Sequence, residues 1–256
     1  SDFDLAIFWD TAPDVDTRRA LVERVADILG TPVDIGYTLE APLLSEESVF
    51  IGGGPGVGFK LDVTHRTVAV MERIIDDVTA GRDGSEDHVE SLYSIQRVLI
   101  LYGEALVRDW QTRAAVYPEA LALQRVTAHL SQLETDLNLH AFRGDLLLYY
   151  QVLTEALEHI VSALFALNRI YRPQLKRLDD LCRELTIAPP DLSARVNALL
   201  RIDVTQGQCT LDALLEDVFA LVAAHLPQAD VAALRARCYG RRRLPFVDPP
   251  SALVIG

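Results

Sequence analysis

The chain has 256 residues, half of them hydrophobic, and a formal net charge of −13. This length suits one large domain or two modest ones with a substantial core. No apolar run approaches the roughly 20 residues that a membrane-spanning helix needs, and the first residues lack the basic start of a secretory signal. We therefore expect a cytoplasmic protein with no membrane partner.

Charge and cysteine content restrict the partners further. Proteins that bind DNA or RNA normally present a basic patch to the phosphates, whereas this chain is acidic and its basic cluster is Arg241–Arg243. Such a cluster is more typical of a solvated or salt-bridged tail, so we expect no nucleic acid partner. The cysteines have no zinc-site spacing, and we expect buried free thiols at Cys182, Cys209 and Cys238.

The first part of the chain mixes strand and helix patterns. A helix capped by Asp16 and ended by Gly30 has a regular apolar face, and a second helix is expected over residues 67–80. The glycine-rich residues 52–56 predict a hairpin turn rather than a phosphate-binding loop. Period-two or continuous apolar patterns predict strands at residues 2–9, 49–51, 57–63 and 98–102.

From residue 117 onward the pattern is helical only. The longest predicted helix spans about 145–171, and shorter ones follow at about 174–185, 191–200, 211–226 and 230–239. We therefore expect an α+β protein. A mixed sheet with flanking helices would occupy residues 1–116, and an all-helical bundle would occupy residues 117–256.

Paired carboxylates at the start of the first strand are the candidate ligands of a metal ion. Asp2 and Asp4 are two residues apart, so their side chains project from one face of a strand. Two like charges at this spacing repel unless a cation lies between them, and hard carboxylate oxygens suit Mg²⁺. Asp62 lies in another predicted strand. If the two strands are neighbours, three acids converge on one or two magnesium ions, an arrangement suited to phosphoryl chemistry.

The run Ser1-Asp2-Phe3-Asp4-Leu5-Ala6-Ile7 resembles the SDxDL strand of polymerase-beta-superfamily nucleotidyltransferases, including bacterial aminoglycoside nucleotidyltransferases. The resemblance implies that Asp2, Asp4 and Asp62 are the catalytic metal ligands. It also implies that Ser1 belongs to the nucleotide-binding motif, and that ATP or another NTP is the donor with Mg²⁺. In that family a glycine-serine motif precedes this strand. It would lie upstream of Ser1, so we expect a truncated start or a chain that is inactive by itself.

A second resemblance concerns the helical half. Residues 163–173, together with Lys176, resemble a helical domain of uncharacterised function that follows such nucleotidyltransferase domains in bacteria. Lys176 would steady a triphosphate as a point charge, although solvent exposure is the simpler interpretation. The pair Gly103-Glu104 resembles one that supplies the general base in some aminoglycoside adenylyltransferases, with a solvated turn glutamate as the alternative for Glu104.

Four further polar residues can be interpreted without a catalytic or binding role. His65 follows Asp62 closely, but a surface histidine at a strand end is the simpler expectation. Asn168 on the long helix is either a cleft-lining group or a satisfied core amide. Glu155 and His159, four residues apart on that helix, predict a surface ion pair.

Together these observations predict a nucleotidyltransferase that moves a nucleoside monophosphate from a magnesium-bound NTP to the hydroxyl of an unknown small-molecule acceptor. The alternative is a non-catalytic interaction protein or a nucleotide sensor that keeps the fold. The expected ligand site lies between the two domains, where ligand sites are common.

Overall fold

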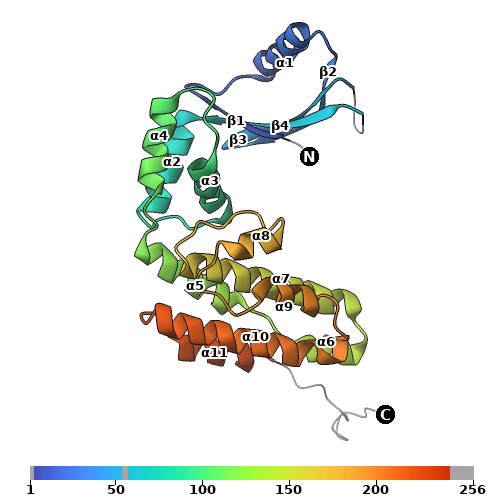
Figure 1. Cartoon of the computed structure of the whole chain (residues 1–256), viewed down its shortest axis with the longest axis vertical. Coiled ribbons are helices and arrows are strands. Elements are labelled where there is room, and N and C mark those ends of the chain that lie inside the picture. The colour runs from blue at the N-terminus through green and yellow to red at the C-terminus, as the bar shows by residue number, and fades with distance from the viewer. Residues whose placement is uncertain (1–2, 54–56, 243–256) are drawn as a thin grey trace, which may run out of the picture. The chain divides into compact units, whose positions relative to one another are not determined.

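The computed structural model describes residues 3–53 and 57–242, which form four strands and eleven helices (Figure 1). The architecture is α+β, as predicted. The chain divides into two compact units, residues 1–77 with the sheet and residues 78–256, whose described part up to residue 242 contains helices and no strand. The prediction placed the boundary between the two parts at residue 116, because the sequence pattern is helical only from residue 117 onward. Within the described ranges, no helix is long and apolar enough to cross a membrane.

The sheet contains strands β1 (Phe3–Trp9), β2 (Val33–Ala41), β3 (Leu44–Ile51) and β4 (Phe59–Thr67) in the order β1-β4-β3-β2. Strand β1 pairs parallel to β4, and the other pairs are antiparallel. The prediction placed β1 and β4 and the last residues of β3 correctly, but it missed β2. The first strand and the Asp62 strand are neighbours, so the condition set for Asp4 and Asp62 to lie close together is met.

Helix α1 (Val15–Leu29) contacts β2 in the first unit. Its N-cap is Asp14, whose carboxylate accepts from the Thr17 backbone N–H at 2.7 Å, so the cap predicted at Asp16 is wrong by two residues. The side chain of Asp14 satisfies one of the helix's unpaired N–H groups. Gly30 ends the helix in the left-handed region with φ 62°, as predicted.

The two faces of the sheet have different environments. Glu47, Val49, Val63 and His65 are buried, and these side chains share one face because residues alternate along a strand. The residues between them, including Asp62, are half-buried or exposed. The predicted metal ligand Asp62 therefore belongs to the more accessible face.

Helix α2 (Val68–Thr79) follows β4 directly and matches its prediction closely. The helices of the second unit are α3 (Glu86–Arg97), α4 (Glu104–Ala114), α5 (Glu119–Gln132), α6 (Leu137–Arg143), α7 (Leu146–Leu167), α8 (Leu178–Arg183), α9 (Leu192–Leu199), α10 (Val204–His225) and α11 (Val231–Gly240).

Two predictions about this unit are wrong. Residues 98–102 form an irregular connection between α3 and α4 rather than a strand, and Leu99, Leu101 and Tyr102 are exposed there. An apolar run becomes a strand only where another strand can pair with it, and helices flank this run on both sides. Helix α10 begins at Val204, earlier than the start predicted near residue 211, and Gly207 lies inside it, where a Cβ would overlap the Tyr149 hydroxyl.

Helix α7 is the centre of the helical core. All six apolar residues that predicted its inner face are buried: Leu153, Leu157, Ile160, Val161, Leu164 and Leu167. It packs most extensively against α5. The helix ends at Leu167, earlier than predicted, because the Asn168 side chain binds backbone beyond the helix. Its amide donates to the Ile187 carbonyl at 2.8 Å, and its oxygen accepts from the Thr186 N–H at 2.9 Å. Asn168 is therefore a satisfied amide.

Candidate functional site

Two of the three predicted carboxylates lie on adjacent strands. Asp4 of β1 is the register partner of Asp62 of β4, and Asp62 is the register partner of Ser48 of β3. Residues paired in this way project their side chains from the same face. One row across three strands therefore contains Ser48, Asp62 and Asp4, with Asp4 exposed and the Asp62 side chain 32% exposed.

The carboxylate of Asp62 has a defined partner for each oxygen. The Ser48 hydroxyl donates to Oδ1 at 2.6 Å, and the Lys60 ammonium lies 2.7 Å from Oδ2. Lys60 is two residues before Asp62 on β4 and so shares its face. The hydroxyl fixes the orientation of the carboxylate, and the ammonium balances its charge. Sequence reasoning missed both residues, although the period-two pattern of β4 already placed Lys60 beside Asp62.

Asp2 and Ser1 lie outside the described residues, so their predicted roles stay predictions. In the described part of the chain, no group of three or more His, Cys, Asp or Glu residues is placed to hold a metal ion. Proteins often bind Mg²⁺ through one or two carboxylates, with substrate phosphates and water completing the shell. Asp4 and Asp62 match that donor set, and their row is accessible to a ligand.

The other two predicted site residues belong to the second compact unit. Glu104 is the first residue of α4, its side chain is 74% exposed, and it lies 3.5 Å from Arg108 of the next turn. Lys176 is exposed in the connection between α7 and α8. The base role of Glu104 and the phosphate role of Lys176 stay predictions.

The opposite face of the sheet contains a buried charged cluster. Arg18 of α1 donates through Nε to Glu47 at 2.8 Å, and both side chains are 3% exposed. The Trp9 indole N–H donates to His65 Nδ1 at 3.1 Å, and His65 Nε2 lies 3.5 Å from Glu47. The expectation that His65 is a surface residue is wrong. Its position two residues after buried Val63 on an alternating strand is the signal that identifies the inner face.

Burial lowers the pKa of His65. The carboxylate of Glu47 opposes this shift, and the positive charge of Arg18 adds to it. Because Trp9 can only donate, His65 Nδ1 accepts and its proton lies on Nε2, toward Glu47. This cluster joins α1 to β1, β3 and β4 and is structural, since it lies on the opposite face from Asp62.

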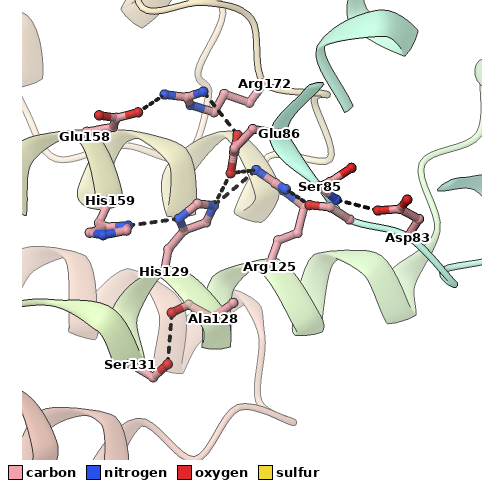
Figure 2. A network of polar contacts seen from close by, with 11 residues as sticks. Asp83, Ser85, Glu86, Arg125, Ala128, His129, Ser131, Glu158, His159 and Arg172 are labelled. Carbon is pink, nitrogen blue, oxygen red and sulfur yellow. Dashed lines mark hydrogen bonds and ion pairs between the residues drawn. The ribbon is translucent and has the colours of Figure 1, made fainter. Parts of the chain in front are cut away.

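A second charged network lies in the helical unit (Figure 2). Glu86, at the start of α3, binds Arg125 at 2.7 Å, Arg172 at 3.1 Å and His129 at 3.2 Å. Arg172 also binds Glu158. Burial alone would raise the pKa of Glu86, but the His129 hydrogen bond and the Arg125 and Arg172 charges outweigh it and lower this pKa to about 2. The network ties α3 to α5 and α7.

The network ends in a pair of histidines. His129 Nδ1 lies 3.2 Å from His159 Nδ1, so His159 contacts His129, while Glu155 accepts from Gln151. The predicted ion pair between Glu155 and His159 is therefore replaced by these contacts. A cavity of about 330 Å³ borders both histidines. Sequence reasoning missed the pairing of His129 with His159 because it joins two helices 30 residues apart.

Acid should weaken this network in two steps. Burial and neighbouring His129 lower the pKa of His159 below 6.5, so the unfolded chain takes up a proton there before the folded chain does. Protonation of His159 therefore favours the unfolded chain, and the free energy of unfolding decreases as pH falls below about 6.5. The stability from Glu86 is lost later, as pH falls from 4.5 toward 2.

We expect His159→Gln to flatten the fall in the urea midpoint of the helical unit between pH 7.5 and 5.5. The buried Trp110 of α4 reports unfolding of this unit. His225→Gln at the exposed end of α10 is the matched control and should keep the wild-type slope. Equal slopes for wild type and His159→Gln would show that His159 does not contribute.

The remaining polar predictions have mixed outcomes. Cys238 is buried and Cys182 half-buried, with the pKa of Cys182 raised by burial to about 11, but Cys209 is exposed, contrary to the expectation. Arg242 forms an ion pair with Asp212, which agrees with a salt-bridged basic cluster. Arg243 lies outside the described residues.

Comparisons with known proteins give two similarities. Residues 88–178 match the family model of a domain of unknown function, DUF4037. The chain is also similar to the crystal structure of a nucleotidyltransferase-like protein from Exiguobacterium sibiricum 255-15, with 14% identity and a TM-score of 0.40. That similarity covers 79% of this chain and 64% of the other, so the chain spans less than two thirds of that protein. No curated protein matches the chain.

Proposed function

We propose that the chain is the nucleotide-transferring part of a nucleotidyltransferase, with the row of Asp4 and Asp62 as its metal-binding edge. The observation that carries this proposal is their pairing in register on adjacent parallel strands, on the more accessible face of the sheet. Carboxylates brought together in this way repel each other unless a cation compensates them. The resemblance of residues 1–7 to the SDxDL strand supplies the class of reaction.

In the proposed reaction, Asp4 and Asp62 hold Mg²⁺, and Asp2 is the predicted third ligand. The metal ion would neutralise charge on the entering and leaving phosphate oxygens. The acceptor hydroxyl attacks the α-phosphorus of the NTP, a new phosphorus–oxygen bond forms, and pyrophosphate leaves with the electrons of the broken bond. Ser48 contributes by holding Asp62 in one orientation. A base takes the hydroxyl proton, and Glu104 is the candidate from the family resemblance.

A second candidate function is a non-catalytic protein that binds partners or senses nucleotides. The observation that favours it is the contact between Lys60 and Asp62, which balances the carboxylate without a metal ion. In that case the row of acids would stabilise the sheet surface and would need no divalent cation.

Transfer of label from an α-labelled triphosphate separates these functions. The chain would be incubated with Mg²⁺, each of the four labelled nucleotides and a panel of small hydroxyl compounds. Magnesium-dependent transfer that also releases pyrophosphate supports the transferase. Nucleotide binding without transfer supports a sensor, and neither result supports an interaction protein.

A further inference from the structure

The contact between Lys60 and Asp62 has a feature that a purely structural ion pair does not need. It lies on the accessible face, with side chains 38% and 32% exposed, and it uses Oδ2 of Asp62, whereas the Ser48 hydroxyl donates to Oδ1. The ammonium therefore occupies the vicinity of one of the two carboxylate oxygens that a metal ion would bind.

Lysine is suited to an ion pair that must break when another cation binds. Its ammonium is a compact charge on a flexible four-carbon stem, whereas arginine forms a rigid fork that binds carboxylates through two hydrogen bonds. The chain has 24 basic residues, and only Lys60 and Lys176 are lysines. The buried structural ion pairs of this protein, at Arg18 and Arg125, use arginine.

We propose that Lys60 is an exchangeable counter-ion of Asp62. Its ammonium balances and orients the carboxylate before a divalent cation binds, and it leaves Oδ2 when the cation arrives. This inference rests on the proposed function, because it requires that Asp62 bind a metal ion. It adds that Lys60 is a positioning residue that sets the affinity of the site for metal.

The sign of the effect follows from charge. A unit positive charge near a divalent cation opposes its binding, and this opposition grows as the two charges approach each other. Removing the ammonium leaves the repulsion between Asp4 and Asp62 uncompensated, which also favours a bound cation. Lys60→Met should therefore bind divalent cations more tightly than the wild type.

The first test measures binding of Mn²⁺ alone, by electron paramagnetic resonance or calorimetry, on the full chain. We expect Lys60→Met to lower the Kd for Mn²⁺ about tenfold, Lys60→Arg to raise it or leave it unchanged, and Asp62→Asn to abolish the site. Arg19→Met is the matched control. It removes one positive charge from an exposed side chain of the same unit, beside Asp16, and should leave the Kd unchanged.

The second test follows the ammonium itself. The protein would be acetylated with an amine-reactive reagent, and the modified lysines would be located by mass spectrometry. The extent of acetylation at Lys60 should increase as Mn²⁺ is added and should reach a plateau when the metal site is full. Lys176 is exposed in the other unit and serves as the internal reference, with no change expected on adding Mn²⁺.

The outcomes separate this inference from the proposed function. If Asp62→Asn abolishes Mn²⁺ binding but Lys60→Met binds like the wild type and Lys60 reactivity is constant, the exchange is wrong and the metal site stands. If neither the wild type nor Lys60→Met binds Mn²⁺ in an Asp62-dependent way, the metal site itself fails. Tighter binding together with increased Lys60 labelling supports the exchange.

Discussion

Asp62→Asn should reduce magnesium-dependent nucleotide transfer by about a thousandfold in kcat/KM, which corresponds to about 4 kcal/mol of transition-state stabilisation. The substitution keeps the size of the side chain and an oxygen for the Ser48 hydroxyl, but it removes the negative charge that would hold Mg²⁺. The rate would be measured with α-labelled triphosphate and the acceptor found in the transfer screen. Asp4→Asn should act in the same direction.

Asp27→Asn on α1 is the control for this prediction, because Asp27 is an exposed helix aspartate outside the sheet that contains the row of acids. It should keep the wild-type rate. A normal rate in Asp62→Asn, with the variant as stable as the wild type, would remove Asp62 from the mechanism. A comparison of urea midpoints ensures that a slow variant is folded.

Arg18→Met should destabilise the sheet unit by about 3 kcal/mol at pH 8, because removing one member of a buried ion pair leaves the other charge uncompensated. The charge left behind is Glu47, which is 3% exposed. Trp9 contacts the same cluster through His65, so its fluorescence should report the unfolding of this unit in urea. Arg19→Met, one residue along α1 but exposed, should change the stability by less than about 0.5 kcal/mol.

The loss in Arg18→Met should be smaller at pH 5.5 than at pH 8. In the wild type, the charge of Arg18 helps to lower the pKa of His65, while Glu47 opposes that shift. Removing Arg18 removes one cause of the lowered pKa of His65, so the folded variant takes up a proton there more readily and loses less stability than the wild type as pH falls. An equal loss at both pH values would show that His65 does not compensate Glu47.

Sequence reasoning identified the carboxylate row because strand alternation is a local rule. The spacing of Asp62 within an apolar run was enough to predict a strand, but only the structure shows that this strand lies beside β1. The α+β class and the inner face of α7 followed from periodicity in the same way. Such patterns depend on neighbouring residues and need no knowledge of the tertiary structure.

The errors arose where distant segments decide the outcome. The polar network of Glu86 draws on α3, α5 and α7, and its partners are up to 86 residues apart. No local pattern predicts which charges will meet. Residues 98–102 have the composition of a strand, but they lie between two helices without a pairing strand. His65 was predicted to be exposed because histidine is often a surface residue. The prediction did not consider that the alternation of β4 places it on the buried face of the sheet.

The position of β1 in the sheet affects how the protein assembles. Strands β2, β3 and β4 follow one another along the chain and pair as antiparallel neighbours, whereas Phe3 pairs with Leu61 across a long intervening stretch. Contacts between residues close in sequence form with less loss of chain entropy, so we expect the three-strand meander to form before β1 docks. We therefore expect Asp4 to reach Asp62 only when β1 docks, so a chain that has formed the meander alone would have one acid of the pair without the other.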